Sequence, residues 1–175
     1  MKALENLLRG TLCFTLCLIA GFVIYKVVSA DPMKTYESVS EDLKIDAFND
    51  WSIEFAPEKE IAKICKTLGG ASNHPALGGL TVFTKKTVML SDNKATAANS
   101  IMHEFGHVLD YESGWISRTE EWAEIYKAEK KVLRRYAQSS PEEFFADVYS
   151  NLALNDRPER TPRATEFVLS VISKR

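Results

Sequence analysis

The order of the hydrophobic patterns constrains the fold of this 175-residue chain more than any other feature. Apolar and polar residues alternate, as in half-buried strands, at residues 51–55, 80–83 and 87–90. Between the first two segments, residues 57–70 show helical spacing and end in two glycines. From Lys94 onward the apolar residues follow helical spacing throughout. Strands and helices come first and helices alone follow. This order predicts one α+β domain, with a short mixed sheet followed by a helical C-terminal half.

Capping signals divide the C-terminal half into separate helices. The second of these helices is expected to begin at a capping box from Ser117 to Glu120 and to carry Tyr136 near its end. The third is expected to begin at "SPEE", with Ser140 as the cap and Pro141 in the first turn. The four helices are therefore expected at residues 96–111, 117–136, 140–154 and 161–173, the last capped by Thr161.

The first 30 residues form a separate segment. A short basic start is followed by about 15 largely apolar residues, and Val28 and Ala30 place small residues where a signal peptidase would cut. We expect a signal peptide that is cleaved after Ala30; an uncleaved membrane anchor is the alternative. Both interpretations deliver residues 31–175 to the outside, as a secreted or an anchored extracytoplasmic domain. Any contact with a membrane would then be through residues 1–30.

Charge and cysteine content limit which partners the domain can bind and whether it can form a disulfide. Residues 31–175 hold 19 basic and 23 acidic residues, so the domain lacks the basic excess that nucleic-acid binding needs. Cys13 and Cys17 lie in the apolar segment and Cys65 stands alone in the exported part, so no disulfide is available within the domain. We expect Cys65 to be a core residue and the protein to be a monomer.

The segment "HEFGH" is the strongest functional signal. His103 and His107 are four residues apart, so on a helix they share one face and can direct two imidazole nitrogens at one metal ion. Glu104 is turned about 100° from that face, beside the ligands, where a carboxylate can accept a proton from water. Gly106 costs the helix about 1 kcal/mol relative to alanine, which indicates a close neighbour there.

A hydrolytic zinc ion needs a third protein ligand. His74 lies in a glycine-rich loop and is a weak candidate. Glu143 and Asp147 are four residues apart on one expected helical face, so Glu143 could bind the metal while Asp147 accepts a proton from a ligand imidazole. Glu143 could equally be only the capping-box partner of Ser140, and spacing does not decide between these roles. Asp110 is either another acceptor for a ligand imidazole or a plain surface residue.

The segments "HEFGHVLDYESG" and "YAQSSPEEFFADVYSNLALND" resemble the family of the anthrax lethal factor catalytic domain and the secreted Pro-Pro endopeptidases. The resemblance covers residues 77–169 and implies a small zincin-type metalloprotease domain that holds one zinc ion. It implies that His103, His107 and Glu143 are the zinc ligands and that Glu104 is the general base. Tyr136 matches a tyrosine that stabilises the oxyanion.

Two further features depend on the same resemblance. Asp147 stands where the family often has glutamate, which is a longer side chain. The segment "ALGGLTV" is similar to a loop and edge strand beside the substrate, so Gly78, Gly79, Leu80 and Thr81 are candidates for pairing with an extended peptide. A plain β-turn is the alternative for that segment.

The sequence thus predicts an exported zinc metalloendopeptidase that hydrolyses bonds in extended protein segments, with proline-containing sites as a weaker expectation. The alternative from another class is a catalytically silent, zinc-stabilised module that captures peptides. Such a module would have no need for Glu104 or Tyr136.

Overall fold

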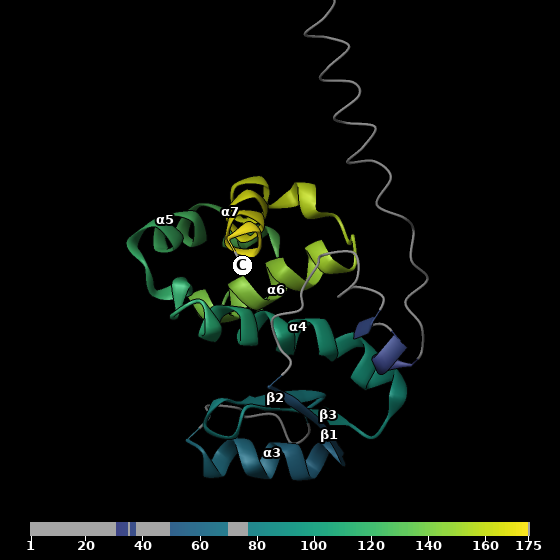
Figure 1. The fold of residues 1–175 in the computed structure, drawn as a ribbon. Helices are drawn as coiled ribbons and strands as arrows, with labels where there is room; N and C mark the ends of the chain where they lie inside the picture. The colour runs from purple at the N-terminus through teal and green to yellow at the C-terminus, as the bar shows by residue number, and fades with distance from the viewer. Residues whose placement is uncertain (1–30, 35, 38–49, 70–76, 175) are drawn as a thin grey trace, which may run out of the picture.

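The computed structural model describes residues 31–34, 36–37, 50–69 and 77–174. The architecture is α+β, as expected: a three-stranded sheet is covered by one helix on one face and by the C-terminal helices on the other (Figure 1). The expectations for residues 1–30, with Cys13 and Cys17, and for His74 lie outside the described residues. Within the described part, no helix is both long enough and apolar enough to span a bilayer.

The sheet consists of β1 (Ser52–Ala56), β2 (Gly79–Val82) and β3 (Thr87–Ser91) in the order β1-β3-β2. Strand β3 is central and fully buried; it runs parallel to β1 and antiparallel to β2. The sheet is therefore mixed, as predicted. The observed strands are within one residue of the predicted bounds, because the alternating pattern fixes the faces of a strand better than its ends.

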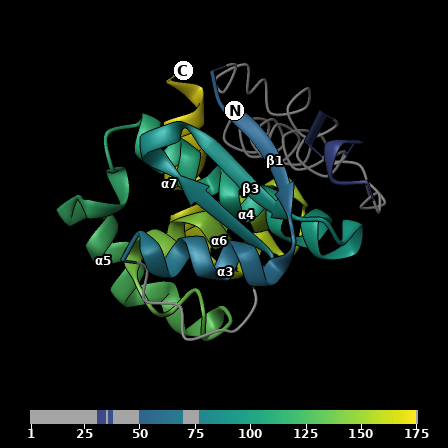
Figure 2. The ribbon, with the colours of Figure 1, turned by 90° about the horizontal axis from the view of Figure 1, so that it is seen from below.

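Helix α3 (Glu58–Thr67) covers one face of the sheet. Its Ile61 packs with Val82 of β2 and Met89 of β3 in a small apolar cluster. Cys65 on the same helix is buried and has a free thiol, as expected for a core cysteine. The opposite face of the sheet packs on α4 (Lys94–Glu112), and Figure 2, which looks from below, shows the strands in front of α4 and α6.

Helix α4 begins two residues earlier than predicted, because the side chain of Asn93 accepts hydrogen bonds from the N–H groups of Ala95 and Thr96. Its main helical neighbour is α6 (Pro141–Ala153). A Cβ atom on Gly106 would lie 2.6 Å from Cα of Ala146, so the two backbones touch there. The close neighbour predicted from Gly106 is therefore the main chain of α6.

The predicted second helix is wrong at both ends. Helix α5 spans Glu120–Glu129 and is capped by Thr119, whose hydroxyl accepts from the N–H of Trp122 at 3.3 Å. Ser117 does not cap it, because its N–H and hydroxyl both donate to Asp110. After Glu129 a short 3-10 turn, η3 (Lys130–Val132), leads into the non-helical loop 133–140. Tyr136 therefore lies on a loop.

Side-chain contacts explain why the helix does not continue to residue 136. The hydroxyl of Tyr126 donates to the carbonyl of Gln138 at 2.6 Å, and the amide of Gln138 donates to the carbonyl of Leu133 at 2.7 Å. These bonds fold the loop back onto α5. Helical spacing of apolar residues alone does not show such tertiary bonds, so it overestimates the length of the helix.

The last helix, α7 (Pro162–Ser173), follows Thr161 as predicted, but the side chain of Thr161 does not cap it. The carboxylate of Glu129 instead accepts from the N–H groups of Arg163 and Ala164, each at 3.1 Å. The end of α5 thus caps the start of α7. Around this junction the C-terminal helices enclose a core of aromatic residues, which includes Trp122, Phe144, Phe145, Tyr149 and Phe167.

Candidate metal centre

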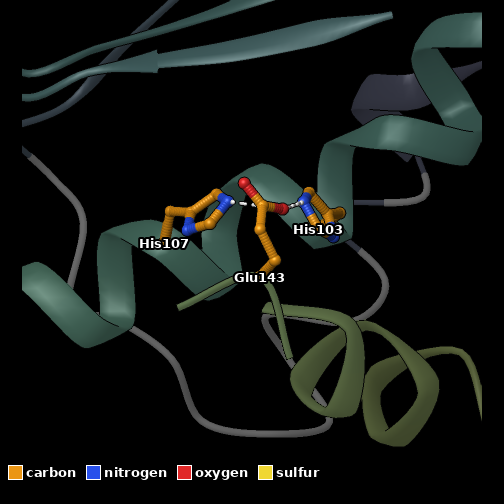
Figure 3. Close-up of side chains that lie close together, drawn as sticks. All are labelled: His103, His107 and Glu143. Carbon is orange, nitrogen blue, oxygen red and sulfur yellow. Dashed lines mark hydrogen bonds and ion pairs between the residues drawn. The ribbon is translucent and has the colours of Figure 1, made fainter. Parts of the chain in front are cut away.

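Two helices bring three potential ligands together. His103 and His107 project from α4, and Glu143 of α6 points between their rings (Figure 3). Oε2 of Glu143 lies 3.0 Å from Nε2 of His103 and 3.5 Å from Nε2 of His107. One donor atom from each residue lies within 4.8 Å of the others. The three residues therefore form a group that could hold a metal ion.

The donor atoms suit a small tetrahedral ion. Zinc bonds to imidazole nitrogen and carboxylate oxygen are about 2.0–2.2 Å long, which places neighbouring ligand atoms about 3.4 Å apart. The separation of 3.5 Å between His107 and Glu143 is close to this value. The 3.0 Å contact between His103 and Glu143 is a hydrogen bond. An ion would replace this bond, and the two atoms would then lie slightly further apart.

The structure shows that the two roles considered for Glu143 do not exclude each other. Its main-chain N–H donates to the hydroxyl of Ser140 at 3.1 Å, which is the helix cap predicted from the sequence. Its carboxylate faces the histidines. It does not turn back to the main-chain N–H of Ser140, as the second bond of a capping box would require. The cap fixes the first turn of α6, and the carboxylate is left to face α4.

Asp147 lies one helical turn after Glu143 and contacts the other side of the same imidazole. Its Oδ1 is 2.8 Å from Nδ1 of His103, the contact that the spacing suggested. This bond directs the Nδ1 proton to Asp147 and leaves Nε2 toward Glu143 and the metal position. The shorter side chain of aspartate therefore suffices here.

Arg134 is the residue of this site that the sequence analysis did not identify. Its Nε donates to Oδ2 of Asp147 at 2.7 Å, and its Nη2 donates to Oδ1 of the same carboxylate. The sequence carries no usable signal for this pair, because Arg134 was expected on a helix and is in fact on loop 133–140.

Asp110, the other expected acceptor, has a different environment. It is fully buried, and its two oxygens accept from the N–H and the hydroxyl of Ser117 at 2.7 and 2.6 Å. These bonds hold η2 (Ile116–Arg118) against the end of α4. Burial raises the pKa of Asp110, while the bonds from Ser117 oppose that rise. Asp110 is thus neither a surface residue nor, in this structure, bonded to a ligand imidazole.

The charges of the ligand group are tightly linked. Burial disfavours protonated His103, but the bonds to Asp147 and Glu143 outweigh burial and raise its pKa from 6.5 to about 9. Burial likewise opposes ionisation of Glu143, yet both histidines hold the pKa of its carboxyl well below the usual range. The pKa of Asp147 is also lowered, against burial, by His103 and Arg134. Without an ion, the group therefore keeps a proton where a cation would bind.

Glu104 is buried and is held by strand β2. The hydroxyl of Thr81 lies 2.8 Å from Oε2 of Glu104 and 3.1 Å from its main-chain oxygen. A Cβ atom on Gly79 would come within 2.6 Å of Oε1 of Glu104, so a side chain at position 79 would displace this carboxylate. The carboxylate thus lies beside the ligand group and against β2.

The outer edge of β2 has no sheet neighbour among the described residues. The N–H of Ser91 donates to the carbonyl of Gly78 at 2.9 Å, which fixes the pairing phase with β3. In an antiparallel ladder the hydrogen-bonded positions alternate, so the main-chain groups of Gly79 and Thr81 point away from β3. Leu80 packs toward α3. The predicted edge strand is therefore present next to Glu104.

Tyr136 reaches the site from loop 133–140. Its ring centroid lies 5.7 Å from that of His103, and 45% of the residue is exposed. Burial of the hydroxyl, together with the negative charges of Glu143 and Glu104, raises the pKa of Tyr136. The hydroxyl therefore stays protonated near neutral pH and can donate a hydrogen bond.

Comparisons with known proteins do not indicate a function, so a functional assignment depends on the geometry described above. No protein-family model matches the chain, and a comparison with curated proteins gives no match either.

Proposed function

We propose that the protein is a zinc-dependent metalloendopeptidase with a zincin-type site. The observation that carries the proposal is the position of Glu143, which comes from α6 and lies between two histidines of one turn of α4. Two histidines and a carboxylate leave the fourth position of a tetrahedral ion open, as hydrolytic zinc sites do. Asp147 and Arg134 complete the support of His103.

The proposed chemistry divides between the ion and the chain. A zinc ion bound here would lower the pKa of water toward about 7 and polarise a carbonyl group. Glu104 accepts the proton of the attacking water and passes it to the departing amine nitrogen. Thr81 keeps the carboxylate of Glu104 oriented while this happens. Glu104 stays outside the ligand group, which suits a base better than a ligand.

Tyr136 supplies a hydrogen-bond donor to the oxyanion that forms during attack on the carbonyl. The hydroxyl of Tyr136 is protonated at neutral pH, as that of an ordinary tyrosine is, so it can act as this donor. Tyr136 also lies next to the ligand group, with its ring centroid 5.7 Å from that of His103.

The substrate is an extended protein segment that pairs with the outer edge of β2. The main-chain groups of Gly79 and Thr81 offer hydrogen bonds along that edge, directly beside Glu104. Pairing of this kind selects an extended backbone and leaves sequence preference to side-chain contacts. A preference for proline-containing sites rests on the family resemblance alone, and the proposed export of the domain rests on the apolar segment within residues 1–30.

The experiment that tests this function uses the full-length chain, loaded with zinc, and a diverse peptide library read by mass spectrometry. Glu104→Gln is expected to retain zinc and to lose at least about 1000-fold in cleavage rate, since it removes the base. Glu142→Gln, a change at a partly exposed acidic residue bonded to Arg118, is the matched control and is expected to cleave normally. Equal cleavage by wild type and Glu104→Gln would refute the assigned role.

A second candidate is the zinc-stabilised peptide-binding module without catalysis. The observation that favours it is the engagement of the Glu104 carboxylate by Thr81, which occupies one of its oxygens. The same experiment separates the two functions. A zinc-loaded protein that retains peptides on the β2 edge and cuts none of them would support the module.

A further inference from the structure

Arg134 makes the only two-pronged charged contact near the ligand group among the described residues. Its Nε and Nη2 donate to different oxygens of Asp147, the geometry in which guanidinium and carboxylate groups match best. Asp147 is 4% exposed, so its negative charge needs a compensating partner. Arg134 supplies that charge from a largely exposed position.

The same carboxylate connects Arg134 to the metal ligand. Oδ1 of Asp147 accepts both from Nη2 of Arg134 and from Nδ1 of His103, the latter at 2.8 Å. Hydrogen bonds thus connect Arg134 on the loop, through Asp147, to the imidazole of His103. A shift of the carboxylate would move the acceptor that sets the orientation of the His103 ring.

Arg134 also lies beside the residue proposed to stabilise the oxyanion. Its guanidinium carbon is 5.7 Å from the ring centroid of Tyr136, two residues further along the same loop. The ring of Tyr136 is in turn 5.7 Å from the ring of His103. One anchored arginine thus places the loop that carries Tyr136 relative to the helix that carries Glu143.

We propose that Arg134 is a positioning residue with two effects: it orients His103 through Asp147, and it fixes the loop that carries Tyr136 over the ligand group. The second effect rests on the proposed function, whereas the first requires only that the group binds a metal. The competing explanation is an exposed ion pair of the kind that has little influence on its surroundings.

The chain offers a matched control for this proposal. Arg135 is the next residue, is also exposed and carries the same charge, so Arg135→Ala reproduces the loss of charge and of side-chain length. Zinc dissociation constants of full-length wild type, Arg134→Ala, Arg134→Lys and Arg135→Ala would be measured by competition with a chromophoric chelator. Circular dichroism and thermal unfolding of the metal-free proteins show whether each variant is folded.

We expect Arg134→Ala to raise the zinc dissociation constant about 10-fold, the lower end of the effect of outer hydrogen-bond partners on metal affinity. Arg134→Lys should recover part of this loss, because lysine restores the charge without the two-pronged geometry. Arg135→Ala should stay within about twofold of wild type. Equal dissociation constants for Arg134→Ala and Arg135→Ala would overturn the role in orienting His103.

The effect on Tyr136 is tested by a double-mutant cycle on kcat with Arg134→Ala and Tyr136→Phe. Arg134→Ala should lower kcat clearly in the wild-type background and less in the Tyr136→Phe background, with KM changed little. The same fold-loss in both backgrounds would overturn the placement of the loop by Arg134. A wild-type protein that binds zinc and cleaves nothing would contradict the proposed function, while the zinc measurements would still decide the first effect.

Discussion

The ligand group and its surroundings are built in different ways. Helices α4 and α6 hold His103, His107 and Glu143 through a backbone contact at Gly106, a helix cap at Ser140 and a buried core. Among the parts proposed to act on a substrate, Glu104 also lies on α4, but the pairing edge and Tyr136 come from strand β2 and loop 133–140. A few side-chain hydrogen bonds fix those two segments, among them the bonds from Thr81 and Arg134. Metal binding should therefore depend on helix packing, and turnover on a small number of polar contacts.

Removal of one of the three proposed metal ligands tests this difference most directly. Glu143→Ala removes the carboxylate that α6 supplies to the ligand group. It should raise the zinc dissociation constant by more than about 100-fold, because loss of a residue that only hydrogen-bonds to a metal ligand already weakens metal binding about 10–100-fold. Chelator competition measures the effect. Glu142→Ala, which changes the adjacent carboxylate, should bind zinc like wild type. Loss of affinity in the control, or retention in Glu143→Ala, would mean that the ligand group is assigned wrongly.

A second prediction concerns pH. In the metal-free protein the pKa of His103 is raised to about 9, so the imidazole is protonated at neutral pH and a metal must displace that proton. Between pH 6.5 and 8 the zinc dissociation constant should therefore fall about tenfold per pH unit, and isothermal titration calorimetry should show proton release on binding. A dissociation constant independent of pH over this range would contradict the proton-bearing ligand group.

The same raised pKa has the opposite effect on the metal-free fold. A group whose pKa is higher in the folded state stabilises it fully below the unfolded value of 6.5, and that contribution is lost as the pH rises through about 9. Thermal unfolding of the metal-free protein should thus begin at lower temperature at pH 8.5 than at pH 6.5. We therefore expect the ligand group to be stabilised by a proton at low pH and by the proposed ion at higher pH.

The smallest expected effect comes from β2. Thr81→Val removes the hydroxyl that bonds to Glu104 and should lower kcat about 10-fold, with little change in zinc affinity. Thr81→Ser restores the hydroxyl and should recover most of the activity. Steady-state kinetics and chelator competition on the two variants give both quantities. A fall in zinc affinity that matches the fall in kcat would show that β2 and the ligand group are not separable.

The parts of the site that could be predicted from the sequence are those set by helical spacing. His103 and His107 share a face because they are four residues apart, and the pair Glu143 and Asp147 follows the same rule. The capping signal at Ser140 correctly located the start of α6. These features depend on local geometry, which the sequence specifies directly.

The remaining parts depend on contacts between distant segments. Arg134 bonds to Asp147 only because α5 ends early, and that end is fixed by Tyr126 and Gln138. Ser117 has the residue type of a helix cap, yet burial next to Asp110 determines its bonds. Glu129, on α5, caps α7 from 34 residues before Arg163 in the sequence. Spacing and capping rules could not identify these partners.

The contact between Gly106 and Ala146 has a consequence for how the protein can vary. Because main chain touches main chain there, no side chain sets the distance between α4 and α6 at that level. Any side chain at position 106 would therefore push α4 and α6 apart, and with them the histidines and Glu143.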